Sequence, residues 1–280
     1  MVKSRLNHGQ TIDLGAFLKR FYLAHPLIRC RMHHNCVRFI WIIFLVNVLP
    51  AFAAPVPPGN VLFRPTFLSP DIAHYAGTAF RVKDGANGQP YFVTAHSLFG
   101  PAADMDVQMS SEDIARVIVA AVGVSCTDPR NVVVARNYVL LPGARRADGD
   151  GAEKDLAVFE LPNRLGDDSL LLDTTPLVRG DKIWVYLKYA GTGRVGLESA
   201  VIAYVSEKEV RYFFENQEAD FRGSTGAPII SAEGKVVGMN LGLFTSKTGR
   251  RFGYGPPATA IRAVWQPSQK PEASVLRPAP

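Results

Sequence analysis

Short apolar runs, separated by glycine, aspartate, asparagine and proline, dominate the chain beyond its first 60 residues. The runs are rich in valine, isoleucine, phenylalanine and tyrosine, which suit the half-buried surface of a β-sheet. Clusters such as Asp-Gly-Ala-Asn-Gly at residues 84–88 favour tight reversals between them. This spacing predicts an all-β protein, either a sandwich or a pair of barrels. The expected strands are residues 78–82, 91–94, 131–141, 156–161, 182–188, 199–205, 209–214, 227–230 and 235–241.

Two segments predict helices within this β-rich pattern. In residues 111–120, Ser111 is the expected cap of the amino end, and the acids Glu112 and Asp113 suit the helix dipole there. A second short helix is expected over residues 256–265. Residues 162–175 are the expected crossing between two halves, and residues 267–280, rich in proline, serine and lysine, predict a loose tail.

The first 53 residues have the order of a secretory leader. Three arginines precede an apolar run over residues 39–49, and Ala-Phe-Ala follows at residues 51–53. The run is shorter than the roughly 20 residues that span a bilayer. We therefore expect cleavage after Ala53, with an uncleaved membrane anchor as the alternative. The mature protein is expected to be secreted or periplasmic, without stable membrane association after cleavage, and translation starts at Met1 or at Met32.

Net charge changes its meaning once the leader is set aside. The whole chain carries +6, from 31 basic and 25 acidic residues, but residues 1–53 hold seven of the basic residues and one of the acids. The remainder has 24 of each, so nothing in the charge predicts nucleic-acid binding. Only Cys126, His74 and His96 remain as cysteine and histidine, which predicts neither an internal disulfide nor a metal site. No cofactor is expected.

Three short motifs follow one another in the body of the chain. The first is Gly-Thr-Ala-Phe at residues 77–80, followed by Tyr-Phe-Val-Thr-Ala-His-Ser at 91–97, in which a strand delivers His96. The second is Lys-Asp-Leu-Ala-Val at 154–158, which places Asp155 at the start of a strand. The third is Gly-Ser-Thr-Gly-Ala-Pro at 223–228, which runs into Gly-Lys-Val-Val-Gly at 234–238.

These motifs resemble the catalytic signatures of chymotrypsin-like serine proteases, in particular the disulfide-free bacterial kind. The resemblance covers about residues 77–264 and implies two six-stranded antiparallel β-barrels, which would divide the mature chain into residues 54–165 and 166–266. By this resemblance His96 is the general base and Asp155 orients its ring. Thr225 takes the nucleophile position, and the alternative register with Ser224 as nucleophile would put Arg222 at the first glycine.

The resemblance also implies an oxyanion hole and a substrate pocket. Glycine at 223 lets the backbone N–H groups of residues 223, 224 and 225 converge on one point. Residues 216–220 would form the base of the pocket and residues 240–243 its wall, where an extended peptide adds as an edge strand. The predicted binding residues are Asp220, Asn240, Leu241 and Gly242.

Two functions follow from these motifs. The first is a monomeric, trypsin-like endopeptidase that hydrolyses peptide or protein substrates through a His96–Asp155–Thr225 triad. The hydroxyl of threonine is capable of acyl transfer, but its second Cβ branch stiffens the side chain and adds a methyl group at a site intolerant of misplacement. The alternative is a catalytically impaired relative that retains the groove and binds peptides or a protein partner.

Overall fold

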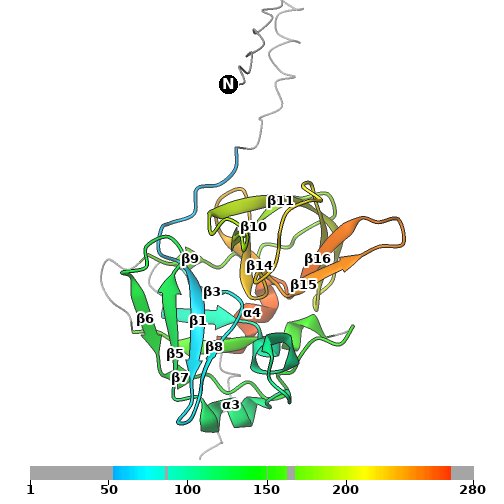
Figure 1. Cartoon of the computed structure of the whole chain (residues 1–280). Coiled ribbons are helices and arrows are strands. Elements are labelled where there is room, and N and C mark those ends of the chain that lie inside the picture. The colour runs from blue at the N-terminus through cyan, green and yellow to red at the C-terminus, as the bar shows by residue number, and fades with distance from the viewer. Residues whose placement is uncertain (1–52, 86–87, 150, 163–167, 266–280) are drawn as a thin grey trace, which may run out of the picture. The chain divides into compact units, whose positions relative to one another are not determined.

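The computed structural model describes residues 53–265, apart from residues 86–87, 150 and 163–167 (Figure 1). The predicted leader and the tail over residues 267–280 lie outside the described residues. Two largely antiparallel sheets hold all sixteen strands of the described chain, as the apolar pattern predicts. Within the described part of the chain, no helix is long and apolar enough to cross a membrane.

The first sheet has nine strands, seven of them in the order β6-β5-β1-β3-β4-β8-β7. Strand β2 pairs with β1, and β9 runs parallel to β3. Three 3-10 turns and one helix lie between these strands along the chain. The elements are β1 (Leu62–Leu68), β2 (Ala73–Tyr75), β3 (Ala79–Lys83), β4 (Pro90–Thr94), η1 (His96–Phe99), η2 (Pro101–Ala103), α3 (Ser111–Val117), β5 (Ala120–Ser125), β6 (Val132–Ala135), β7 (Asn137–Tyr138), η3 (Ala152–Lys154), β8 (Ala157–Glu160) and β9 (Leu170–Leu171).

The second sheet has seven strands in the order β14-β13-β10-β11-β12-β16-β15. Its two ends approach each other, because Leu241 N–H donates to Tyr254 O at 2.9 Å and Met239 N–H to Pro256 O at 3.1 Å. This closure agrees with the barrel-like fold expected from the sequence. The elements are β10 (Lys182–Lys188), β11 (Val195–Val205), β12 (Val210–Phe214), β13 (Ala227–Ile230), β14 (Val236–Asn240), β15 (Gly242–Thr245), β16 (Arg251–Gly255) and α4 (Ala258–Trp265).

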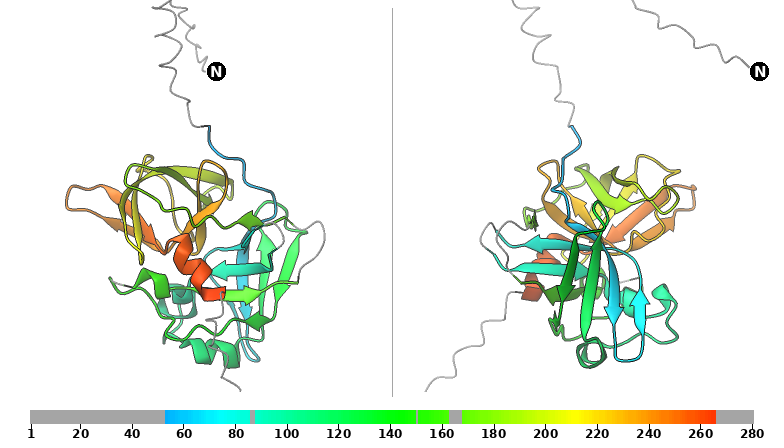
Figure 2. Two further views of the ribbon diagram at one scale, coloured as in Figure 1. Left: turned by 180° about the vertical axis from the view of Figure 1, so that it is seen from behind. Right: turned by 60° about the vertical axis from the view of Figure 1, so that its left-hand side comes forward.

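The carboxyl-terminal helix α4 joins the two sheets. It packs against β14 of the second sheet, and in the view from behind it lies where the two sheets meet (Figure 2). Arg262 Nε donates to Asp84 Oδ2 at 2.8 Å, in the turn that follows β3 of the first sheet. The larger apolar core likewise includes side chains from both sheets, for example Phe80 and Phe159 of the first and Trp184 of the second. The site residues therefore belong to one packed body.

Several sequence expectations need correction. The cap of α3 is Ser110 rather than Ser111: its hydroxyl accepts from Asp113 N–H at 3.0 Å, and the Asp113 side chain bonds back to the Ser110 N–H. The predicted boundary between residues 165 and 166 precedes β9, which still belongs to the first sheet. The sheets contain nine and seven strands, not six each. The pattern also missed β1, β2, β5, β9, β15 and β16.

Candidate active site

The loop that carries Thr225 has the backbone conformation that the motif requires. Gly223 and Gly226 both have positive φ angles, +74° and +87°, which favour glycine. A Cβ at Gly226 would lie 2.1 Å from Thr78 O and 2.7 Å from Thr94 Oγ1, so no side chain fits there. The two glycines flank Ser224, which is buried, and Thr225, which is partly exposed.

Bonds from both sheets hold this loop. On the side of the first sheet, Thr78 N–H donates to Thr225 O at 2.8 Å, and Thr78 Oγ1 donates to Gly223 O at 2.6 Å. On the side of the second sheet, Gly226 N–H donates to Asn240 O at 2.7 Å. The loop is therefore fixed in place before any ligand binds.

Arg64 adds a clamp that the sequence did not predict. Its Nη1 donates to Gly77 O at 2.9 Å and to Gly223 O at 3.2 Å, and its Nη2 donates to Lys188 O at 3.4 Å. One guanidinium thus ties β1 of the first sheet to two segments of the second. An arginine within an apolar strand is the only sequence signal of this role.

Two of the three predicted oxyanion-hole donors are available. Ser224 N–H donates to Phe221 O at 3.0 Å, so it is already occupied. Among the described residues, the N–H groups of Gly223 and Thr225 have no hydrogen-bond acceptor. These two groups flank a residue whose own donor is satisfied, and they are free to bind a carbonyl or an oxyanion.

The acid predicted at Asp155 is buried and well bonded. Its side chain is only 2% exposed, and it follows η3 at the start of the segment that leads into β8. Oδ1 accepts from Ser97 N–H at 2.7 Å, and Oδ2 accepts from Ala147 N–H at 3.1 Å. Burial raises the pKa of this carboxyl group, and these two backbone donors and the Ser97 hydroxyl act in the opposite direction.

His96 has other partners. Its ring Nδ1 lies 3.3 Å from Gln108 Nε2, and the same amide nitrogen donates to the backbone oxygens of His96 and Phe99 at 3.1 Å. Ring Nε2 is buried without a hydrogen-bond partner. Burial lowers the pKa of His96 to about 4, and the nearby Glu112 opposes that shift. The structure therefore brings neither ring nitrogen of His96 to Asp155.

The predicted substrate-binding residues differ in what they do. Asn240 is fully buried: its Nδ2 donates to Ser224 O and Oγ at 3.1 and 3.0 Å, and its Oδ1 accepts from Tyr212 OH at 2.7 Å. Leu241 is also buried, whereas Gly242 begins β15, the last strand of the second sheet. Asn240 thus holds the Thr225 loop in place through its hydrogen bonds to Ser224, and Gly242 belongs to a strand at the edge of the sheet.

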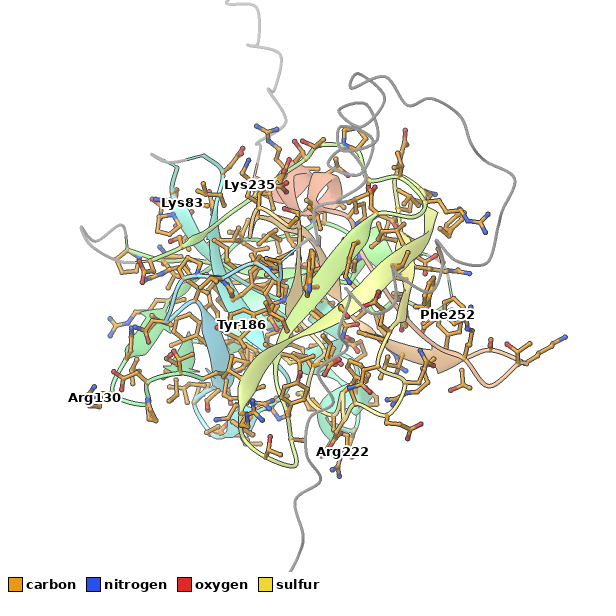
Figure 3. The ribbon with its side chains drawn as sticks, turned by 90° about the horizontal axis from the view of Figure 1, so that it is seen from above. Lys83, Arg130, Tyr186, Arg222, Lys235 and Phe252 are labelled. Carbon is orange, nitrogen blue, oxygen red and sulfur yellow. The ribbon has the colours of Figure 1, made fainter. Side chains whose placement is uncertain are left out.

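Asp220 is engaged by a neighbouring arginine. Arg222 Nη2 lies 2.7 Å from Asp220 Oδ2, and Arg222 Nε lies 3.0 Å from Oδ1. These bonds lower the pKa of Asp220 to about 2. Arg222 itself is 80% exposed and lies at the rim of the molecule (Figure 3). The carboxylate is therefore ionised and paired.

The fold, the motif order and the loop conformation all point to one family, and comparison with family models decides the matter. A model described as "Trypsin-like peptidase domain" matches residues 77–239, more than half of the chain. The chain belongs to this family. Membership in the trypsin-like peptidase domain family places it among the serine-type peptidases, and it confirms the resemblance stated from the three motifs.

Solved structures with this fold are distant in sequence. The thermostable serine protease AL20 from an extremophilic microorganism is 14% identical, with a TM-score of 0.50, over 74% of this chain and 95% of that one. The active form of the Rv3671c protease from M. tuberculosis is 15% identical, with a TM-score of 0.47, over 75% and 86%. The apo MamO protease domain from Magnetospirillum magneticum is 15% identical, with a TM-score of 0.46, over 75% and 97%. No curated protein sequence matches the chain.

Proposed function

We propose that this trypsin-like peptidase domain binds extended peptide segments and that its turnover through His96, Asp155 and Thr225 is impaired. One observation carries the proposal: neither ring nitrogen of His96 is hydrogen-bonded to Asp155, since one lies beside Gln108 and the other is buried without a partner. A general base must reach the proton that it removes and must hold a pKa near the working pH. His96, with a pKa of about 4, meets neither condition.

Peptide binding is supported by what remains intact. The free N–H groups of Gly223 and Thr225 are suited to a peptide carbonyl. Strand β15 follows directly after Asn240, which bonds the same loop, and within the described strands it pairs only with β16. An extended peptide can add to such an edge through its backbone. The proposed partner is therefore a peptide or an extended segment of a protein.

The second candidate is the endopeptidase expected from the sequence. It is favoured by the family match and by the two free N–H donors, since the oxyanion hole alone leaves about 10³- to 10⁴-fold catalysis without a triad member. For either candidate we also propose export to a secreted or periplasmic location, which rests on the predicted leader. We propose a monomeric state as well, which rests on the closed body of the chain.

One experiment tests the proposal. The purified mature protein is incubated with a mixed peptide library and with a fluorophosphonate probe, and bound peptides are identified by mass spectrometry. We expect intact peptides to be retained, with neither cleavage products nor labelling of Thr225. Hydrolysis that disappears in both Thr225→Ala and His96→Gln would overturn the proposal in favour of the endopeptidase.

A matched pair of glycine variants checks where the peptide binds. Alanine at Gly223 is strained by its positive φ and reaches Arg64, so the N–H donors should be displaced. Gly249 has a similar φ of +80° but open space around it. We expect Gly223→Ala to weaken peptide affinity about fivefold or more, the effect of one lost hydrogen bond of about 1 kcal/mol. Gly249→Ala should leave affinity unchanged; equal affinity in both variants would place binding elsewhere.

A further inference from the structure

We propose that Ser97, not His96, occupies the position from which a general base would accept the proton of the Thr225 hydroxyl. The chain then carries a serine where this proton transfer needs an imidazole. The inference rests on the proposed function, from which it takes the peptide ligand. It adds the residue that limits turnover. It follows from the direction in which each side chain leaves the single turn η1.

The first line of support is the pairing of residue 97 with the acid. Ser97 N–H donates to Asp155 Oδ1 at 2.7 Å, and the Ser97 hydroxyl is close enough to the carboxylate to lower its pKa by hydrogen bonding. Both the backbone N–H and the hydroxyl of Ser97 thus act on the Asp155 carboxylate. Ser97 is 5% exposed, so little of its surface is open to solvent. The side chain that meets the acid is therefore the one at position 97.

The second line of support is where the His96 ring goes instead. Gln108 binds the ring and two carbonyls of η1 with one amide group, and Glu112 is the charge that acts most on the ring. Both residues lie in the segment that leads into and begins α3. The ring also lies near Phe99, with centroids 6.4 Å apart. Side chains 96 and 97 therefore leave the turn in different directions, and His96 faces the α3 side.

The third line of support is that the segment around residue 97 borders the nucleophile loop. A Cβ at Gly77 would lie 2.5 Å from Leu98 Cδ1 and 2.8 Å from Thr225 O, so Leu98 and Thr225 meet at this glycine. Thr94 Oγ1 would similarly touch a Cβ at Gly226. Residues on both sides of Ser97 contact residues 77 and 226 around Thr225. The segment that carries Ser97 therefore borders both the buried acid and the loop.

The chemical consequence is specific. Attack by the residue 225 hydroxyl on a fluorophosphonate forms an O–P bond and expels fluoride. Attack on a peptide carbonyl forms an O–C bond as the C=O π electrons move onto oxygen to give an oxyanion. In both reactions the hydroxyl proton moves to a base. The lone pairs of a serine hydroxyl are far too weakly basic to take up this proton at neutral pH. An imidazole oriented by a carboxylate accepts the proton and, in peptide hydrolysis, later returns it to the leaving amine. A histidine at 97 would supply the missing acceptor, and Thr225→Ser would remove the additional methyl group.

The test is a factorial series at positions 97 and 225. Fluorophosphonate labelling is measured for the native protein, Ser97→His, Thr225→Ser and the double variant Ser97→His/Thr225→Ser. We expect the double variant to react at least about 100-fold faster than Thr225→Ser, within the range that positioned acid–base groups contribute. Ser97→Gln/Thr225→Ser is the matched control, because glutamine is comparable in size to histidine but is not a base; it should react no faster than Thr225→Ser.

Two further measurements keep the assignment falsifiable if a histidine at 97 disturbs folding. In the Thr225→Ser background, His96→Gln should change labelling less than about twofold, whereas loss of labelling would show that His96 is the base and overturn the assignment. In a folded Ser97→His protein, the ring proton on Nδ1 should show a downfield NMR signal that disappears in Asp155→Asn. A folded double variant that binds peptides without labelling would refute the role of Ser97 and leave peptide binding standing; a native protein that binds no peptide would refute the proposed function alone.

Discussion

The two halves of the candidate site differ in how completely they are built. The loop over residues 223–228 has both glycines at positive φ, two free N–H donors and bonds to both sheets. In the segment over residues 94–98, Ser97 N–H donates to the buried acid Asp155, and the His96 ring lies beside Gln108, which precedes α3. In the proposed function the first half binds a ligand carbonyl, and the second half is the one that would have to move a proton. Binding and proton transfer are thus separable in this fold.

The difference has a physical origin. Loop conformation depends on backbone geometry, and the contacts that enforce it, from Thr78, Arg64 and Asn240, lie outside the motif. Proton transfer depends on one imidazole in one orientation, so a shift of a single residue in η1 removes it. Preserved loop geometry therefore does not imply a preserved base.

The largest expected effect comes from breaking the well-built half. Alanine at Gly226 would have a strained φ and would place Cβ 2.1 Å from Thr78 O, which is backbone and does not move aside easily. We expect Gly226→Ala to lower the free energy of unfolding by about 3 kcal/mol or more and to abolish peptide binding. Gly143→Ala, with φ +76° and open space, should cost only about 1 kcal/mol in urea unfolding. Equal losses in the two variants would show that the close packing at Gly226 is unimportant.

The next effect concerns the histidine of the other half, and it appears as a pH dependence. The folded pKa of about 4 lies below the ordinary 6.5, so between these values the folded state binds fewer protons than the unfolded state. Stability from this group is complete above pH 6.5 and falls as the pH drops toward 4. Between pH 7 and 4.5 the loss should be about 2.5 kcal/mol.

His96→Gln is the control for this measurement. Burial raises the pKa of Asp155, so the folded state takes up its proton at a higher pH than the unfolded state does. The contribution of Asp155 to stability therefore increases as the pH falls, opposite to that of His96. Subtracting the pH profile of His96→Gln isolates the histidine from Asp155 and the other carboxylates. Identical profiles in the two proteins would show that the ring is not buried in solution, and would weaken the contrast between the two halves.

The same division separates the features that the sequence predicts from those that it misses. The bounds of β10 and β13 agree with their predicted ranges, because apolar, β-branched runs flanked by turn residues record strand burial directly. In the structure Asp155 is a buried acid, and the Thr225 loop is a turn flanked by two glycines of positive φ. These features depend on residues close together in the chain, which a motif represents well.

The features that the sequence missed depend on the direction of a side chain or on contacts between residues far apart in the chain. A motif gives the order of residues 96 and 97, but the direction in which each side chain leaves a 3-10 turn is set by the packing of Gln108 and Asp155 around it. Arg64 contacts Gly223 across 159 residues, and no local pattern encodes that pairing. Strand β5, Ala-Ala-Val-Gly-Val-Ser, lacks the bulky residues that would have marked it.

A smaller effect is expected from removing the side chain of Arg64, which links the first sheet to the second. Arg64→Met keeps much of the apolar stem but removes bonds to Gly77, Gly223 and Lys188. We expect a loss of about 1–2 kcal/mol in unfolding free energy and a fewfold loss in peptide affinity. Arg130→Met is the matched control, since Arg130 is 90% exposed and should contribute less than about 0.5 kcal/mol. If both variants bind peptide as the native protein does, the loop does not need the clamp.

The smallest effect tests whether Asp220, the acid predicted in the substrate pocket, belongs to the half of the site that is proposed to bind the peptide. Arg222→Ala leaves an exposed position and should change stability by less than about 0.5 kcal/mol. It also frees the Asp220 carboxylate from its arginine partner, so the Asp220 pKa should rise from about 2 toward the ordinary carboxyl range. Because an unpaired carboxylate attracts cations, peptides with lysine or arginine should then bind about two- to fivefold more tightly at low salt, and the gain should fade at high salt. Calorimetric titration with lysine- and leucine-containing peptides measures this selectivity, and an equal gain for both peptides would place Asp220 outside the groove.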